Sequence, residues 1–157
     1  MTGSARIISV ALDEAGLPAP TPELDQERRV AMFDLTENSF FAPMGAAPGP
    51  YRLHLALEGH RLTLTATPEA GGDGVPVVLS LAPLRQTIRD YGAICQTYFA
   101  AVNHQPLAQI EALDAGRRAI HAAGADALDA MLAPQVKTDA PTRRRLFSLI
   151  AVLLPPG

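Results

Sequence analysis

The sequence has no tryptophan and only one cysteine, Cys95, among its 157 residues. A single thiol excludes an internal disulfide and a zinc site built from several cysteines. Aromatic residues account for only 5% of the chain, so the core must consist mainly of Leu, Ile, Val and Ala. Charged residues are also few, at 18%, and the 48% of hydrophobic residues indicates a globular fold rather than disorder.

Long apolar runs and an excess of basic charge are both missing. The longest apolar run, Leu146–Leu154, is interrupted by Ser148 and is about half as long as a bilayer-spanning helix. No basic segment followed by an apolar run opens the chain, so we predict no signal peptide, no membrane contact and a cytoplasmic location. The formal net charge of −3 gives no general attraction to nucleic acid, and nucleic acid is not expected as a partner.

The residues that are present predict a single α+β domain over residues 1–157, a length that fits one core. Three segments have the composition of strands: Arg6–Leu12, Tyr51–Thr67 and Val75–Leu81. The middle segment alternates leucine with polar residues on both sides of a turn, which predicts a β-hairpin. We expect a small, mostly antiparallel sheet, made of this hairpin and one or two further strands, covered by three or four helices.

Turns are predicted where glycine and proline gather. A two-residue turn at Glu58-Gly59 would pair Leu55 with Leu62 and place the leucines of both strands on one face. Pro43–Pro50 is too rich in proline and glycine for regular structure and is expected to be a loop.

Helix signals surround these strands. Thr21 is an N-cap residue followed by Pro22 at the first helical position, and Gly124 is suited to end a helix. The helices are expected from Pro22 to Glu37 or Asn38, over Leu84–Val102, over Pro106–Ala123, and from Thr138 or Asp139 to Leu154, with Val136–Asp139 as a linker.

The helix over Leu84–Val102 has the most regular apolar face. Its apolar residues recur at alternating steps of four and three, as they do on one side of a helix: Leu84, Ile88, Tyr91, Cys95, Tyr98, Phe99 and Val102. We therefore predict a core helix whose two tyrosine hydroxyls need polar partners.

The helix over Pro106–Ala123 mixes polar with apolar residues on one face. Asp114, Arg117 and His121 fall in the same arc as Ile110 and the other bulky apolar residues, and such groups need partners if buried. We expect the two helices to pack with their polar groups facing each other, and any site to lie at that seam. The candidate ligand-binding residues are Tyr91, Tyr98, Asp114, Arg117, Arg118 and His121.

Two interpretations of this seam remain open. A carboxylate, a guanidinium and an imidazole at helical spacing can bind an anionic ligand, or His121 can titrate in acid–base chemistry. Alternatively, Asp114 only forms ion pairs with arginine, while arginine and histidine complement the helix dipole. We favour the second interpretation and a non-enzymatic role. A pocket that opens onto Arg117 and His121 would favour the first.

Other clusters point less clearly to function. Arg143, Arg144 and Arg145 could contact an anion or RNA, but a solvated helix face is the simpler interpretation. The four histidines lack the spacing of metal ligands, so we expect no metal site and no cofactor. The nearly all-apolar run Phe147–Leu154 is either fully buried or half of a homodimer contact.

The chain resembles an uncharacterised family of small bacterial proteins of unknown function. The matching segments span nearly its whole length: Glu37-Asn38-Ser39-Phe40, Gly49-Pro50-Tyr51, Leu79-Ser80-Leu81 with Pro83, Asp90-Tyr91, Ile110-Glu111-Ala112 with Asp114, Gly116-Arg117-Arg118 with His121, and Arg144-Arg145-Leu146-Phe147. The C-terminal Leu154-Pro155-Pro156 departs from the family pattern. The resemblance implies no activity, substrate or catalytic residue. The leading hypothesis is therefore an interaction or accessory protein, with an anion-binding protein or enzyme as the alternative.

Overall fold

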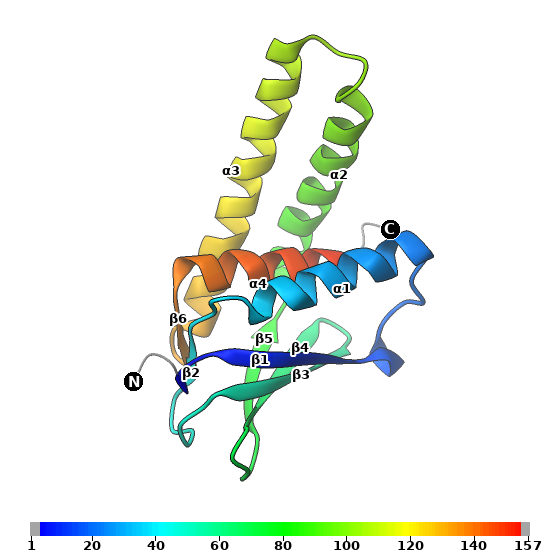
Figure 1. The fold of residues 1–157 in the computed structure, drawn as a ribbon. Coiled ribbons are helices and arrows are strands. Elements are labelled where there is room, and N and C mark those ends of the chain that lie inside the picture. Colours follow the sequence, from blue (N-terminus) through cyan, green and yellow to red (C-terminus); the bar gives the residue numbers. More distant parts are fainter. Residues whose placement is uncertain (1–3, 155–157) are drawn as a thin grey trace.

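Two helices lie across one face of a small sheet, and two more form an arm that projects from this body (Figure 1). The computed structural model describes residues 4–154. The strands are β1 (Ile7–Asp13), β2 (Phe41–Pro43), β3 (Tyr51–Glu58), β4 (Arg61–Pro68), β5 (Val75–Ser80) and β6 (Val136–Thr138). The helices are α1 (Pro22–Thr36), α2 (Arg85–Ala101), α3 (Leu107–Leu132) and α4 (Ala140–Leu153), with short 3₁₀ turns at Glu14–Gly16 and Ala82–Leu84.

The main sheet has four strands in the order β1-β3-β4-β5. β1 is parallel to β3, whereas the β3–β4 and β4–β5 pairs are antiparallel. The predicted α+β class and the mostly antiparallel sheet are therefore confirmed. The short antiparallel pair of β2 and β6 was not predicted: β2 precedes the Pro43–Pro50 loop, and β6 lies in the segment expected to be a linker.

The predicted register of the hairpin was wrong by two residues. Leu55 lies opposite Leu64 rather than Leu62, and the turn is formed by Gly59 and His60. Gly59 has a φ of +63°, a conformation that glycine adopts without the steric cost of a side chain. A shift of two residues preserves the alternation of faces, so the leucines expected to be buried are buried.

Both helices on the sheet begin at the predicted caps. The hydroxyl of Thr21 accepts a hydrogen bond from the backbone N–H of Leu24 at 3.1 Å. The carboxylate of Asp139 accepts one from the N–H of Thr142 at 2.9 Å. Each cap satisfies an N–H group that the first helical turn leaves without an intrahelical partner.

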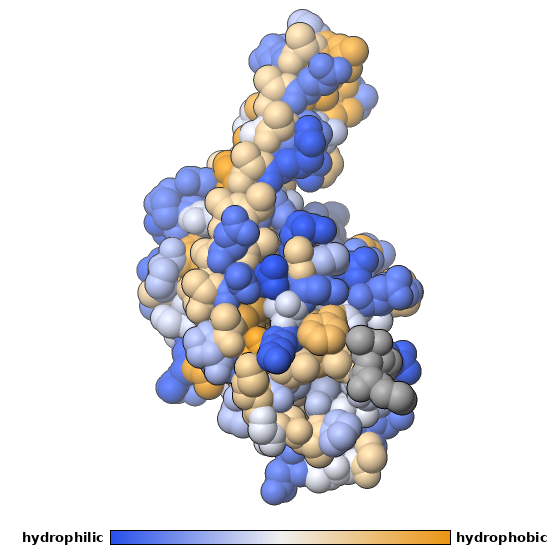
Figure 2. All heavy atoms as spheres, turned by 90° about the vertical axis from the view of Figure 1, so that its left-hand side faces the viewer, coloured by the Kyte–Doolittle hydropathy of each residue, from blue (hydrophilic) through white to orange (hydrophobic). Residues whose placement is uncertain are grey.

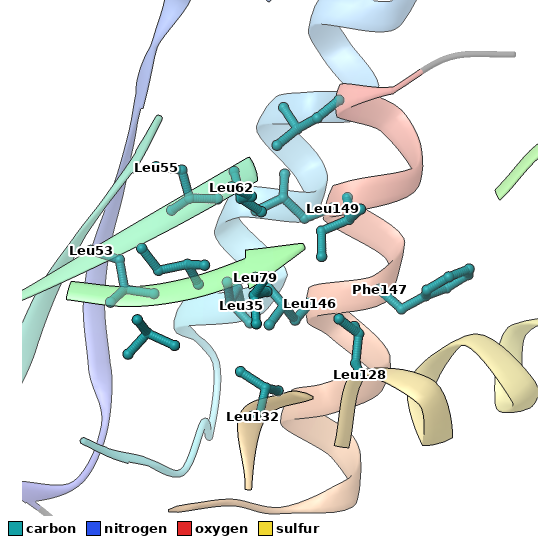
Figure 3. Close-up of a cluster of buried hydrophobic side chains, with 14 of the residues drawn as sticks. Leu35, Leu53, Leu55, Leu62, Leu79, Leu128, Leu132, Leu146, Phe147 and Leu149 are labelled. Atoms are coloured by element: carbon teal, nitrogen blue, oxygen red, sulfur yellow. The ribbon is translucent and has the colours of Figure 1, made fainter. Parts of the chain in front are cut away.

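The core lies between the inner face of the sheet and the helices α1 and α4 (Figure 3). Leucines from β3, β4 and β5 meet leucines from α1, α3 and α4: Leu53, Leu55, Leu62 and Leu79 with Leu35, Leu128, Leu132, Leu146 and Leu149. The run Phe147–Leu154 contributes Phe147, Leu149, Ile150 and Leu153, which are all fully buried within the chain. Ser148, Ala151, Val152 and Leu154 of the same run are only partly buried, so one side of the run belongs to the core and the other side is open.

The predicted end of the third helix was wrong. α3 continues through Gly124 to Leu132, and Gly124 is buried in its middle. A Cβ atom at Gly124 would lie 2.2 Å from Cε1 of Phe147, a side chain that points from α4 away from the sheet. This glycine is therefore needed for close packing of α3 on α4 and not for a helix end. Pro155 and Pro156, expected to stop the last helix, lie outside the described residues.

The predicted core helix is core only at its base. Leu84 and Ile88 are buried, but Phe99 is 70% exposed, because α2 leaves the body and continues beside α3 as the arm. Figure 2 shows the arm rising from the body, with apolar surface at its far end, where Val102 and Leu107 are exposed. Within residues 4–154, no helix combines the length and the apolar character needed to cross a membrane.

Candidate functional site

The two arm helices bring the predicted polar residues together at one seam. The guanidinium carbon of Arg117 lies 5.1 Å from the ring centre of Tyr98. One turn further along α3, the ring of His121 lies 5.3 Å from that of Tyr91. The expected packing of α2 on α3 through these groups is therefore present.

Asp114 forms ion pairs with two arginines at the seam. Its carboxylate oxygens lie 2.5 Å from Nη2 of Arg117 and 3.1 Å from Nε of Arg118. The hydrogen bond from Arg117 is the main cause that holds the pKa of Asp114 below its usual value. Because two arginines share one carboxylate, the cluster keeps a net positive charge.

Arg117 is only partly satisfied by these contacts. Its Nε atom is buried and has no hydrogen-bond partner among the described residues. The Tyr91 hydroxyl interacts with both the Arg117 guanidinium and the Cys95 thiol. Burial raises the pKa of Tyr91, so the phenol stays protonated at neutral pH and remains a hydrogen-bond donor.

His121 is partly buried and joins α3 to α4. Its ring packs against Phe147 at 5.2 Å as well as against Tyr91, and its Nε2 lies 2.8 Å from the hydroxyl of Ser148. The Oγ atom of Ser148 also lies 3.2 Å from the backbone carbonyl oxygen of Arg144, one turn earlier in α4. Burial, followed by the positive charges of Arg117 and Arg144, lowers the pKa of His121.

A cleft of about 750 Å³ opens beside the seam, between α1, α2 and α4. This volume lies in the range typical of small-molecule sites. Its apolar walls are formed by Leu24, Val30 and Ala31 of α1, Phe99 of α2, and Ala151 and Val152 of α4. Its polar groups, apart from acids on α1, include Tyr91, Cys95, Arg117, Arg145 and Ser148. The cleft is thus a largely apolar space that contains arginine.

The six predicted ligand-binding residues separate into two groups. Tyr91 and Arg117 line the cleft, whereas Tyr98, Asp114, Arg118 and His121 do not. Sequence reasoning missed the α1 wall, where lining residues recur every three or four positions from Glu23 to Asp34. It also missed Ser148, which lies in a run that was considered only for its apolar character.

Two of the three consecutive arginines of α4 are engaged in contacts within the chain. Arg143 donates to the carbonyl of Thr138 at 2.9 Å and lies 3.5 Å from the carboxylate of Asp129. Arg145 donates to the backbone carbonyl of Glu37 and contributes to the cleft. Two of the three side chains are therefore held by contacts within the chain, which weakens the hypothesis of a shared RNA-binding surface.

Comparisons with known proteins identify similar bacterial chains. Residues 4–155 match the "Uncharacterised protein family (UPF0262)". A UPF0262 protein of Jannaschia sp. (strain CCS1) is 50% identical over 149 residues, which cover 94% of this chain and 96% of the relative. A UPF0262 protein of Paracoccus denitrificans (strain Pd 1222) is 46% identical over 155 residues, 96% of each chain. No solved structure matches the chain.

Proposed function

We propose, for a chain that belongs to the uncharacterised UPF0262 family, that the cleft between α1, α2 and α4 binds a small organic anion with an apolar body. The observation that carries this proposal is an arginine with an unsatisfied Nε in the lining of an otherwise largely apolar cleft. A buried N–H group without a partner costs free energy, and an anion that reorganises the guanidinium can recover it. A cytoplasmic location is part of the same proposal.

The proposed role is binding without chemical conversion. Ser148 and His121 are in contact, but His121 does not line the cleft, so its imidazole is not placed to act on a ligand there. A general base must lie within hydrogen-bond reach of the proton that it abstracts. Ser148 also lies inside α4, where backbone N–H groups are used by the helix and cannot stabilise an oxyanion.

The first test compares two arginines that share Asp114. Binding of an organic anion should raise the free energy of unfolding, by about 2.7 kcal/mol when the ligand is present at 100 times its Kd. We expect Arg117→Gln to lose this stabilisation and Arg118→Gln, whose side chain is 70% exposed and outside the cleft, to keep it. Thermal unfolding over a panel of aliphatic and aromatic carboxylates, sulfonates and phosphates measures the effect.

Two results would contradict the proposal. In the first, no anion of the panel stabilises the unmodified chain. In the second, both arginine variants lose the same amount of stabilisation, which would assign the effect to general positive charge at the seam rather than to the cleft.

A second candidate function is contact with a protein partner through the arm. Phe99, Val102 and Leu107 are exposed on its outer half, and exposed apolar surface of this kind is typical of interaction sites. If the partner is a second copy of this chain, sedimentation at tens of micromolar should show a dimer that Leu107→Ser dissociates. A monomer in both cases would remove the homodimer from consideration.

A further inference from the structure

We infer that the ligand of the cleft is a monocarboxylate with an unbranched apolar tail, bound with its carboxylate at Arg117 and its tail along α2 toward Phe99. This inference rests on the proposed function and adds the chemical class of the ligand. It depends on three features of the cleft: the distribution of charge, the available hydrogen-bond donors and the course of the apolar walls.

The charges around the cleft fit a single negative charge on the ligand. Arg117 and Arg118 share the carboxylate of Asp114, so one positive charge remains there, and Arg145 adds a second cation to the lining. The α1 wall carries three exposed acidic residues, Glu23, Glu27 and Asp34. A phosphate group, with a charge of about −1.5 to −2 at neutral pH, would be repelled by this wall. A carboxylate carries a single negative charge and is therefore repelled less by these three acids.

Arg117 and Tyr91 supply the donors that a carboxylate requires. The Arg117 side chain is 30% exposed and pairs with Asp114 through Nη2, while Nε has no partner among the described residues. A small rotation of the guanidinium toward the cleft therefore breaks no hydrogen bond at Nε. The planar guanidinium can present two parallel N–H groups to a planar carboxylate, and the protonated Tyr91 hydroxyl offers a third donor.

The apolar part of the cleft follows one side of α2. The lining residues from Tyr91 through Cys95 to Phe99 are one helical turn apart and span about 12 Å at 1.5 Å per residue. With carbon–carbon bonds of about 1.5 Å, an extended chain advances about 1.3 Å per carbon, so this path accommodates about eight to ten carbons. On the two walls, Val30 is 48% exposed and Phe99 is 70% exposed, and a tail between them would remove apolar surface from water.

A tail that ends in an ammonium group is the competing ligand. Glu27 acts electrostatically on Cys95 across the cleft, so a carboxylate lies within reach of the tail. Glu27 is exposed, however, and water screens its charge, so pairing an ammonium group there contributes little. We therefore expect the uncharged tail to bind more tightly than the ω-amino tail.

Calorimetric titration of the full chain with a matched set of ligands tests the inference. The set contains decanoate, decyl phosphate, decanol and the ω-amino derivative of decanoate, together with shorter and longer carboxylates, all below their micelle concentrations. Decanoate should bind most tightly of the four. Each added methylene should tighten binding by about two- to fourfold until the chain reaches the length of the path, after which the gain should stop.

Three variants distinguish the contribution of the ligand's carboxylate from that of its apolar tail. Arg117→Gln should weaken decanoate binding by at least about tenfold, because it removes a charge-assisted pair. Phe99→Ala should preserve carboxylate binding but flatten its dependence on chain length. Phe33→Ala is the control for Phe99, since Phe33 is similarly exposed on α1 but lies outside the cleft, and it should change neither property.

The possible failures are distinguishable. If decyl phosphate binds more tightly than decanoate and still requires Arg117, the carboxylate assignment is wrong but the proposed anion site stands. If affinity is independent of chain length, or if the ω-amino compound binds best, the assignment of an uncharged apolar tail is wrong. If binding of every anion is unchanged in Arg117→Gln, the inference and the proposed function both fail.

Discussion

Arg117 and His121 lie one turn apart on α3, yet their surroundings give them different charge states. The hydrogen bond from Arg117 to Asp114 raises the pKa of the arginine, which stays charged. His121 is enclosed by Tyr91 and Phe147, and burial together with nearby arginines lowers its pKa. At neutral pH, Arg117 is therefore the cation of this pair, and His121 is a neutral packing residue.

The lowered pKa of His121 predicts a pH dependence of stability. Between that lowered value and the ordinary value of 6.5, the unfolded chain binds a proton that the folded chain does not. The contribution to stability is therefore fully present above pH 6.5 and is lost as the pH falls below it. In His121→Phe, which keeps a ring between Tyr91 and Phe147, urea unfolding should show a smaller loss of stability between about pH 7.5 and about pH 5.5.

The groups that face His121 from the packed elements are Arg117, Arg144, Tyr91 and Ser148. Neither arginine changes its charge in this range, so the difference between the two proteins reports on residue 121. His54→Gln, on the exposed outer face of the sheet, is the control and should retain the slope of the unmodified chain. Equal slopes for His121→Phe and the unmodified chain would contradict the assignment of His121 as a buried neutral group.

At the scale of elements, the contact between α3 and α4 fixes the position of the arm. Gly124 of α3 lies directly against the ring of Phe147 of α4. Glycine within an exposed helix is usually less stable than alanine by about 0.5–1 kcal/mol, so replacement would ordinarily stabilise the chain. Here Gly124→Ala should instead reduce the free energy of unfolding by about 1–3 kcal/mol, because the buried ring cannot move away.

Gly116→Ala is a matched comparison on the same helix. Its Cβ would lie 2.8 Å from Cδ1 of Ile94, the end of a flexible side chain on α2 that can rotate away. This variant should therefore lose less stability than Gly124→Ala in chemical denaturation. If Gly124→Ala is instead more stable than the unmodified chain, the close contact with Phe147 is misassigned.

At the scale of the whole molecule, local signals in the sequence predicted where helices begin better than where they end or how the hairpin strands pair. Thr21 caps α1 as expected, and Asp139 caps α4, where Thr138 or Asp139 was expected, because capping depends on residues adjacent in the chain. Gly124 was interpreted as a helix end, since a glycine that stops a helix and one that permits close packing look alike without the partner ring. The register of the hairpin was predicted wrongly for a similar reason. The expected pairing and the observed pairing, which differ by two residues, bury the same face of the hairpin.

Neither the arm nor the cleft could be predicted from local sequence patterns. The apolar face of α2 has the same spacing whether it packs on a sheet or on a neighbouring helix, so Phe99 could not be identified as exposed. The cleft is built from helices that are far apart in the chain and meet only in the folded molecule. Tyr91 and Arg117 were predicted as site residues because buried polar groups need partners. Val30 is apolar, so nothing in the sequence marked it as part of a site.

The central claim is that an organic anion binds between α1, α2 and α4 at Arg117. A nuclear magnetic resonance titration of the labelled full chain with decanoate tests it most directly, because each backbone amide reports its own surroundings. We expect saturable shifts that cluster in residues 23–34 of α1, 91–99 of α2 and 145–152 of α4, and that disappear in Arg117→Gln. Shifts confined to the outer face of the sheet or to the far end of the arm would contradict it.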